Sequence, residues 1–430
     1  MMTRKKTPQK ARKAPERQGT PWSRLTPRRT TVTALLVFLL MGIWLRLAYV
    51  NVSTPPSPDE TLYVRTAKQM SEKGFSARTG IPLKRTYLAL LAGVMKISGA
   101  YDARAGAWLS TAASILSLMA LGAIGARFLS PWAAVYAMFS LAASLLARVA
   151  ARRCWQESIM EFLGLLMVWS ACEITRNHRK WWPYVTLFGF AGCAVLVKPL
   201  GIFVALAAVS YVLALLMARR EWRMLAGFAL GGLLAAGLSL WALSELGRGT
   251  GRLSALYTIF YASRVDDQYS WATRHQSGPW YSMVQGLWIL TPVNLVFCAV
   301  ATALAVTRDR ILERLGLRFG TEERALLRLF ASTSVFVLAV ISVLPLAQNF
   351  RFLASIYGAM YLLAGMGFAA ILDLANRHLR RFSAPAVAIL ALVVVSGAVA
   401  EQGTFERVFV RGGMQDLALD FVIRLSYYDN

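Results

Sequence analysis

The sequence contains few charged residues and few of the residues that metal sites and nucleophilic catalysis require. Only 16% of its 430 residues are charged, whereas about a quarter are charged in an average soluble domain. Its four cysteines and three histidines are scattered, and no Cys-x-x-Cys or His-Glu-x-x-His motif occurs. Walker A and Gly-x-Gly-x-x-Gly motifs are also absent. These absences leave no support for a disulfide-bonded scaffold, a zinc protease, a P-loop ATPase or a Rossmann enzyme.

Hydrophobic residues are abundant instead. They make up 57% of the chain, and the mean hydropathy is +0.48. The 47 Lys and Arg outnumber the 22 Asp and Glu, which gives a formal net charge of +25. A basic chain can bind nucleic acid through a water-facing basic surface, but these basic residues form short clusters between long apolar runs. The pattern is typical of a membrane protein with many spans and predicts no nucleic-acid partner.

Eleven apolar runs predict an all-α, polytopic membrane protein with about eleven transmembrane helices. The runs are residues 31–50, 106–126, 131–147, 157–174, 182–197, 199–217, 224–244, 284–306, 329–347, 352–372 and 384–400. We expect a disordered basic cytosolic tail at 1–30, a transmembrane module at 31–400 and a short extracytoplasmic tail at 401–430. Alternate loops carry most of the Lys and Arg, which predicts a cytosolic N-terminus in a plasma membrane. The apolar stretch 86–99 is too short for a span and is predicted to form an interfacial or re-entrant helix outside.

The loop after the first run carries an acidic pair at the predicted start of a surface helix. Pro58 suits the first position of a helix, which places Asp59 and Glu60 in the first turn. Tyr63 follows on an apolar stripe that would lie along the membrane surface. Asp59 could simply cap this helix, or its carboxylate could serve as a general base. The spacing alone leaves both interpretations open.

Several short motifs, all expected on the outer side, follow one another in a recognisable order. They are Arg46 near the end of the first run, Asp59-Glu60-x-x-Tyr63, the stretch Arg152–Met160 with Glu157, Val197-Lys198-Pro199 and Asn349-Phe-Arg351-Phe-Leu353. Their order resembles the polyprenyl-phosphate-dependent, C-type membrane glycosyltransferases, which include protein O-mannosyltransferases and lipid A aminoarabinose transferases. The resemblance covers about residues 31–372.

The resemblance implies an enzyme that moves a sugar from a polyprenyl-phosphate donor to a hydroxyl acceptor on the outer face of the membrane, with inversion. The acceptor would be a glycolipid such as lipid A, a cell-envelope glycan or a protein. Asp59 would be the general base, and Glu60 would shape the acceptor site or assist a metal. The donor phosphate would be held by Arg351, Lys198, Arg46 and Lys84, with Tyr63, Arg153 and Glu157 lining the site. No cofactor is certain; a divalent metal ion is compatible with the carboxylate pair, but no ligand set is legible.

Each of these residues also has a structural interpretation. Arg46 and Lys198 could extend to the membrane interface, and Arg351 could anchor a lipid headgroup. Arg153, Glu157 and Glu161 have the spacing of one helix face, so Arg153–Glu157 could be an i,i+4 ion pair. His275 is predicted to be solvated, and the loop 245–283 is expected to act as a lid over the donor.

Two features depart from, or compete with, the glycosyltransferase interpretation. The segment Gly80–Arg85 lacks the second acid that some members of the family carry after the surface helix. A transporter or flippase of lipid-linked sugars without transferase activity is the main alternative, although ionisable residues lie at helix ends rather than at mid-span. A protein that only binds polyprenyl phosphate is a third. The sequence leaves the sugar, the acceptor and the oligomeric state open.

Overall fold

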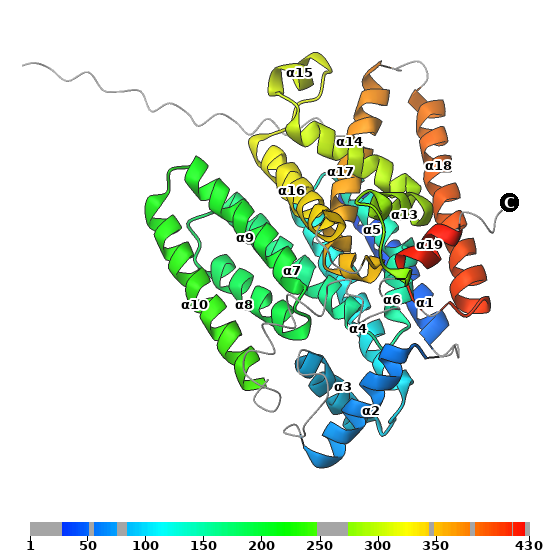
Figure 1. Cartoon of the computed structure of the whole chain (residues 1–430). Coiled ribbons are helices and arrows are strands. Elements are labelled where there is room, and N and C mark those ends of the chain that lie inside the picture. Colours follow the sequence, from blue (N-terminus) through cyan, green and yellow to red (C-terminus); the bar gives the residue numbers. More distant parts are fainter. Residues whose placement is uncertain are drawn as a thin grey trace, which may run out of the picture.

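The computed structural model describes residues 28–50, 56–74, 84–246, 274–343, 348–378, 383–414 and 416–425. Within these ranges the chain is built of helices, and its β-type pairing is limited to one isolated bridge between Asn349 and Ala418. The helices form a bundle (Figure 1). The all-α prediction is confirmed for the described part of the chain.

Every predicted apolar run contains or overlaps helix in the structure. The helices concerned are α1 (Arg28–Val50), α4 (Ala103–Phe128), α5 (Pro131–Ala143) with α6 (Leu145–Ala151), α7 (Glu157–Arg176), α8 (Trp182–Val197), α9 (Gly201–Ala218), α10 (Trp222–Leu246), α13 (Ser282–Leu290) with α14 (Pro292–Val306), α16 (Thr321–Val343), α17 (Tyr357–His378) and α18 (Ser383–Thr404).

The number of spans is less clear than the number of helices. Among the described residues, eight helical segments are long and apolar enough to cross a membrane, and a ninth is obtained if α5 and α6 count as one span bent by 49°. Helices α8 and α14 are apolar but have only 16 and 15 residues. The chain is therefore a multi-pass helical membrane protein, while the count of eleven spans stays a prediction.

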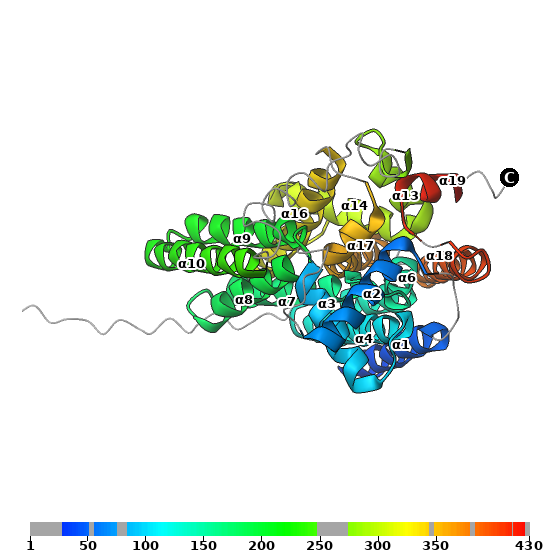
Figure 2. The ribbon, with the colours of Figure 1, turned by 60° about the horizontal axis from the view of Figure 1, so that its bottom comes forward.

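Two helices that are not spans pack together at one end of the bundle. Helix α2 (Pro58–Lys73) begins at Pro58, as predicted, but Ser57 is its N-cap: the Ser57 hydroxyl accepts the N–H of Glu60, and the Glu60 carboxylate accepts the N–H of Ser57. This capping box satisfies two N–H groups that a helix start leaves free. Helix α3 (Arg85–Ser98) follows where a short surface helix was expected. Figure 2 brings α2 and α3 to the front, across α4.

A close helix contact fixes the position of the segment around residue 350. The short 3-10 helix η3 (Phe350–Ile356) leads into α17 and packs against α7. A Cβ added at Gly164 of α7 would lie 1.9 Å from the carbonyl oxygen of Ser355. Only glycine allows this approach, which brings η3 against the first turns of α7.

The C-terminal region returns to the same end of the bundle. Helix α18 continues as a π-helix (Phe405–Arg411), and α19 (Leu419–Leu425) follows. Between them, the Phe350 N–H donates to Leu417 O at 3.1 Å and the Leu419 N–H donates to Gln348 O at 3.3 Å. The described part of the expected tail thus packs on the segment that opens η3.

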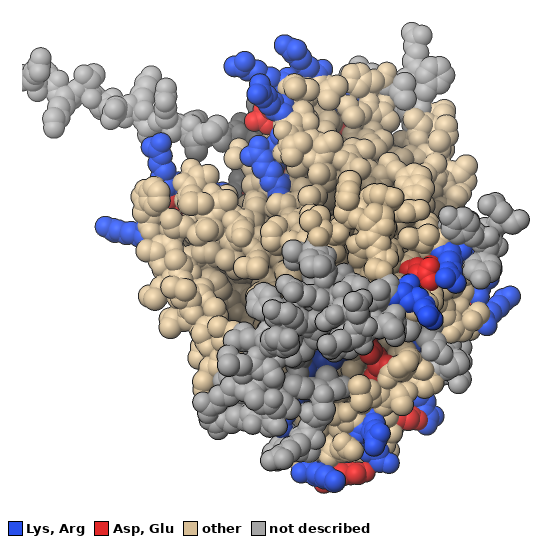
Figure 3. Space-filling model, in the orientation of Figure 1, with Lys and Arg blue, Asp and Glu red and all other residues tan. Residues whose placement is uncertain are grey.

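On the face that Figure 3 shows, most of the charged side chains lie towards its two ends. On the face in Figure 3, blue and red side chains gather near α15 (Asp309–Arg314) at one end and near α2 and α19 towards the other, and the described surface between them is almost wholly uncharged. This distribution fits a bundle whose middle faces lipid. The loops after α4, α7, α9, α14 and α17 lie at the α15 end, and α2, α3 and η3 lie at the opposite end.

Candidate functional site

A single arginine joins three carboxylates at the α2 end of the bundle. The Arg351 side chain, 6% exposed, donates from Nε to Glu157 Oε1 at 3.1 Å, from Nη2 to Asp59 Oδ2 at 3.2 Å and from Nη1 to Asp416 Oδ1 at 3.4 Å. Its guanidinium also lies over the Trp155 ring, 4.2 Å from the ring centroid. The three nitrogens therefore bind carboxylates from three separate parts of the chain.

Glu157 connects this arginine to a lysine. It is the first residue of α7 and is buried, and its Oε1 also accepts from Lys198 Nζ at 2.9 Å. Lys198 follows α8 in the predicted tight turn and lies over the Phe352 ring. Burial lowers the pKa of Lys198, and the neighbouring Glu157 carboxylate offsets part of that shift. Glu157 thus holds two cations at the start of α7.

Asp59 is the accessible carboxylate of the cluster. Its side chain is 44% exposed, whereas that of Glu157 is 1% exposed. Its Oδ2 accepts from the Tyr63 hydroxyl at 3.3 Å as well as from Arg351. Burial raises the pKa of Asp59, but the charges of Lys84 and Arg351 lower it, and the resulting pKa is below the ordinary value. Because Ser57 caps the helix, Asp59 has no capping role.

Lys84 completes the cluster from the start of α3. Its ammonium donates to the Tyr63 hydroxyl and lies 4.6 Å from the centroid of the Tyr63 ring. Burial lowers the pKa of Lys84 to about 8, although the nearby Asp59 charge favours the protonated form. Tyr63 therefore links a cation to the exposed carboxylate.

Glu60 faces away from this cluster despite being next to Asp59. Besides its capping role, it accepts the backbone N–H of Cys154 at 2.8 Å and pairs with Arg153 at 3.5 Å. Its side chain is 3% exposed. Glu60 thus fastens α2 to the turn between α6 and α7, and no contact places it beside Asp59 in the cluster.

Arg46 lies apart from the other predicted phosphate ligands. It is buried in the bundle, where it donates to the Ser114 hydroxyl and to the carbonyl oxygens of Gly42, Leu141 and Ala142. Leu141 and Ala142 belong to the last turn of α5, whose carbonyls have no partner within the helix. Arg46 caps that helix end, and the structure does not bring it to Arg351.

The expected i,i+4 relation of Arg153 and Glu157 is wrong, because α7 begins only at Glu157. Arg153 lies in the preceding turn, where it pairs with Glu60 and lies over Trp155. Glu161 does follow Glu157 by one turn and is buried inside the bundle, as expected for an acid within a span. His275 is predicted to be solvated rather than a ligand; its side chain is 17% exposed and its ring contacts Asp420 at 3.1 Å.

Sequence reasoning missed two members of the cluster. Asp416 lies in a segment that matched no motif, and Asn349 Nδ2 and the Leu417 N–H both donate to its Oδ1. Trp155 lay inside a quoted motif without a role, yet it is fully buried beneath Arg351. The position of Trp155 between Arg152-Arg153 and Glu157 was the signal that could have indicated its place in the cluster. Nothing in the sequence singled out Asp416.

The carboxylates of this cluster do not form a metal site. Among the described residues, no three His, Cys, Asp or Glu side chains come together as a cation site. Asp59, Glu157 and Asp416 surround a guanidinium, whereas a divalent ion needs several free oxygens around one point.

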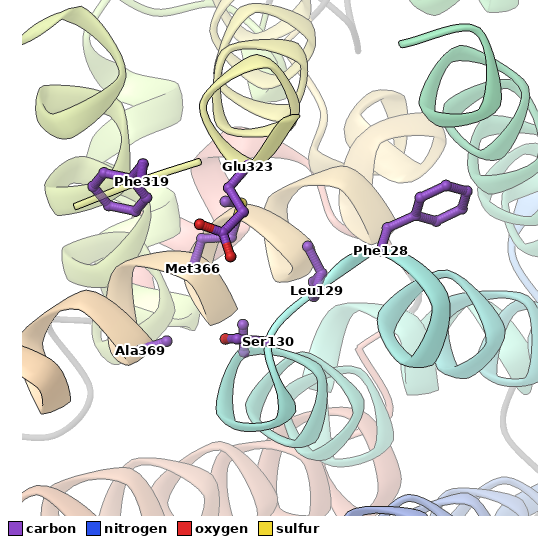
Figure 4. A pocket seen from close by; sticks show the side chains of 8 residues that line it. Phe128, Leu129, Ser130, Phe319, Glu323, Met366 and Ala369 are labelled. Atoms are coloured by element: carbon purple, nitrogen blue, oxygen red, sulfur yellow. The ribbon is translucent and has the colours of Figure 1, made fainter. Parts of the chain in front are cut away.

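A separate hollow lies at the other end of α4. Its walls come from the α4–α5 turn, the start of α16 and α17, and the residues are Phe128, Leu129, Ser130, Ala133, Phe319, Glu323, Met366 and Ala369. Figure 4 shows the Glu323 carboxylate among apolar side chains; it accepts the N–H of Gly320 at 3.0 Å. None of the predicted site residues lines this hollow.

Residues 1–27, 80–83 and 247–273, and so most of the expected lid, lie outside the described residues.

Part of the chain is similar to a known protein family. Residues 86–242 match the family model of dolichyl-phosphate-mannose-protein mannosyltransferases. No curated protein sequence matches the chain.

Solved structures of two proteins have a similar fold. ArnT from Cupriavidus metallidurans in the apo state has a TM-score of 0.58 at 14% identity, covering 92% of this chain and 77% of that chain; ArnT was also solved bound to undecaprenyl phosphate, with a TM-score of 0.56 at 14% identity, covering 92% and 76%. The archaeal oligosaccharyltransferase AglB from Archaeoglobus fulgidus, in complex with an inhibitory peptide and a dolichol-phosphate, has a TM-score of 0.58 at 11% identity. That match covers 89% of this chain but 56% of AglB, so the chain spans little more than half of the archaeal protein.

Proposed function

We propose that this chain transfers a sugar from a polyprenyl-phosphate donor to a hydroxyl acceptor. The family-model match over residues 86–242 and the fold support this proposal, as does the resemblance of the motifs to polyprenyl-phosphate-dependent C-type membrane glycosyltransferases. The acceptor is a glycolipid, a cell-envelope glycan or a protein. The reaction takes place at the α2 end of the bundle, and its general base is Asp59.

One observation carries the proposal. An exposed carboxylate, Asp59, lies directly beside Arg351, with Lys84 and Lys198 near enough to lower its pKa. A transferase of this kind needs a base for the acceptor and cations for the phosphate within one small volume. The site supplies both: Asp59 is the base, and Arg351, Lys198 and Lys84 are the cations.

The transfer is a single displacement. The acceptor hydroxyl gives its proton to the Asp59 carboxylate while its oxygen attacks the anomeric carbon. The bond from that carbon to the donor phosphate breaks, and the bonding pair leaves with the phosphate oxygen, which inverts the configuration. The departing phosphate is a stable anion, so it needs preorganised cations rather than a strong acid. Arg351, Lys198 and Lys84 supply them.

The distribution of basic loops supports an outer-face site. The loops rich in Arg and Lys, such as 307–320, lie at the end of the bundle opposite η3. Basic loops favour the cytosolic side, so the end with Asp59 and Arg351 faces away from the cytosol. The N-terminus is then cytosolic, and the protein resides in a plasma membrane with its site at the periplasm or exterior.

The test uses purified protein in lipid nanodiscs and a panel of radiolabelled polyprenyl-phosphate sugars, with and without candidate acceptors. Release of polyprenyl phosphate is followed for the wild type, Asp59→Asn and Arg351→Ala. Asp102→Asn is the control, because Asp102 is an exposed acid that caps α4 and bonds Arg104, away from the cluster. We expect turnover in the wild type and Asp102→Asn only. Full activity in Asp59→Asn would refute the base assignment, and movement of the lipid between leaflets without turnover would favour the flippase.

A further inference from the structure

The cations of the cluster already face carboxylates before any donor arrives. Among the described residues, Arg351, Lys198 and Lys84 face Asp59, Glu157 and Asp416. Arg153 pairs with Glu60 and also lies near Asp416. Each of the three Arg351 nitrogens already binds a carboxylate oxygen, and these bonds use three of the five guanidinium N–H groups. An incoming phosphate either replaces one of these carboxylates or binds a remaining N–H beside a carboxylate, where the two anions repel each other.

The three carboxylates are held with unequal strength. Glu157 is buried and bonds Lys198 as well as Arg351 with the same oxygen. Asp416, 12% exposed at its side chain, is also held by Asn349 and by the Leu417 N–H at 2.7 Å. Asp59 is 44% exposed, and its other hydrogen bond, from the Tyr63 hydroxyl, measures 3.3 Å. Water weakens an exposed ion pair more than a buried one, so Asp59 is the carboxylate that an incoming anion can displace.

Building on the transferase function above, we propose that the donor phosphate replaces Asp59 on Arg351, while Glu157 and Asp416 hold the guanidinium in place. Asp416 is then a positioning residue, since it acts through Arg351 and not on the substrate. The exchange consists of one ion pair broken and another formed, with no covalent change.

The exchange explains how a paired aspartate can act as a base. While Asp59 is bound to Arg351, one of its oxygens is engaged and the neighbouring positive charges favour its ionised form. Replacement by the phosphate frees that oxygen, and the anion neutralises the cations that made the carboxylate a weak base. The base is thus released only when a donor is present, which orders donor binding before deprotonation of the acceptor.

The test measures binding of radiolabelled undecaprenyl phosphate, without acceptor, to protein in nanodiscs of neutral lipid. Asp59→Asn removes the competing charge, and we expect it to bind the lipid about fivefold more tightly than the wild type. Arg351→Ala should lose most of the affinity. Glu72→Gln, an exposed acid on the same helix α2, should bind as the wild type does.

Asp416→Asn is the decisive comparison because it removes the same charge from the same guanidinium. If Asp59 and Asp416 affect binding only through their negative charge near Arg351, both asparagine variants bind the lipid more tightly and by the same factor. If exchange occurs at Asp59, Asp416→Asn binds no more tightly than the wild type, and Asp416→Glu restores wild-type affinity and KM. Equal tightening in the two asparagine variants, or unchanged binding in Asp59→Asn, would overturn the exchange.

This outcome is separable from that of the proposed function, because the binding assay requires no turnover. Tighter lipid binding in Asp59→Asn with no transfer from any donor in the wild type would support the exchange and refute the transferase. Transfer that depends on Asp59, with lipid binding unaffected by Asp59→Asn, would do the reverse.

Discussion

The Glu60 carboxylate accepts the backbone N–H of Cys154 at 2.8 Å, across 94 residues of sequence. Its neighbour Asp59 points instead to Arg351. Two adjacent acids at one helix start therefore have different tasks: Glu60 fixes the position of α2, and Asp59 is presented to the cluster. This division gives separate expectations for stability and for catalysis.

Glu60→Ala should destabilise the protein, whereas Asp59→Asn should not. Glu60→Ala removes the carboxylate that pairs with the buried Arg153 and accepts the N–H groups of Ser57 and Cys154. Breaking a buried pair from one side costs about 3–5 kcal/mol. Thermal unfolding in detergent should show a clearly lower midpoint for Glu60→Ala and a near wild-type midpoint for inactive Asp59→Asn. Equal midpoints for the two variants would contradict the division of roles.

Activity should fall at high pH because Lys84 loses its proton. Its pKa of about 8 lies within the assay range, and only the protonated ammonium attracts a phosphate. The value of kcat/KM for the donor should therefore be highest below about pH 8 and decline above it. Tyr63 does not titrate there, because burial raises its pKa well above the ordinary value.

Lys84→Arg distinguishes Lys84 from the other groups of the site. A guanidinium keeps its charge throughout this range, so the variant should retain activity at pH 9 relative to pH 7 even if its maximum is lower. A decline identical to that of the wild type would assign the titration to another group, such as Lys198.

Gly164→Ala should disturb the site indirectly, by changing the contact between α7 and η3. The added methyl group would meet the Ser355 carbonyl oxygen at 1.9 Å, so α7 and η3 must separate. Overpacking of this kind costs about 1–3 kcal/mol, and it shifts Arg351 relative to Glu157. Gly189→Ala in α8 is the matched control, because its Cβ meets nothing within 4 Å. We expect lower thermal stability and weaker donor binding for Gly164→Ala only; similar behaviour of both variants would contradict the proposed contact.

The sequence predicted the elements well and the cluster in part, for physical reasons. Apolar runs identify helices because a segment that crosses lipid must satisfy its own backbone N–H and C=O groups. Pro58 marks the start of α2. Residues at the outer ends of such runs necessarily share one surface, so Lys198 and Arg351 could be expected near Asp59. Which of these side chains contact one another depends on how the helices pack, and the pattern of apolar runs does not encode that packing.

Contacts that depend on tertiary pairing could not be predicted. Asp416 reaches Arg351 because a short segment pairs with residues 348–350 through the Asn349–Ala418 bridge, and a single bridge leaves no periodic signature. The role of Arg46 was equally hidden: an arginine near a helix end can point outward to phosphate or inward to a neighbouring helix. Helix α5 ends at Ala143, and its last carbonyls accept hydrogen bonds from Arg46, so the Arg46 side chain points inward.

Arg46 should therefore contribute to stability and not to donor binding. Arg46→Met removes the donors to the Ser114 hydroxyl, Leu141 O and Ala142 O. Leu141 O still accepts the Ser144 N–H, but a buried acceptor that loses its partner, such as Ala142 O, costs about 1–3 kcal/mol. The thermal midpoint should fall, while affinity for undecaprenyl phosphate in the folded protein should stay within about twofold of the wild type. Lys198→Met is the comparison, since Lys198 lies in the cluster and its loss should weaken lipid binding. If Arg46→Met weakens lipid binding as strongly as Lys198→Met does, Arg46 belongs with the phosphate ligands, as the sequence first suggested.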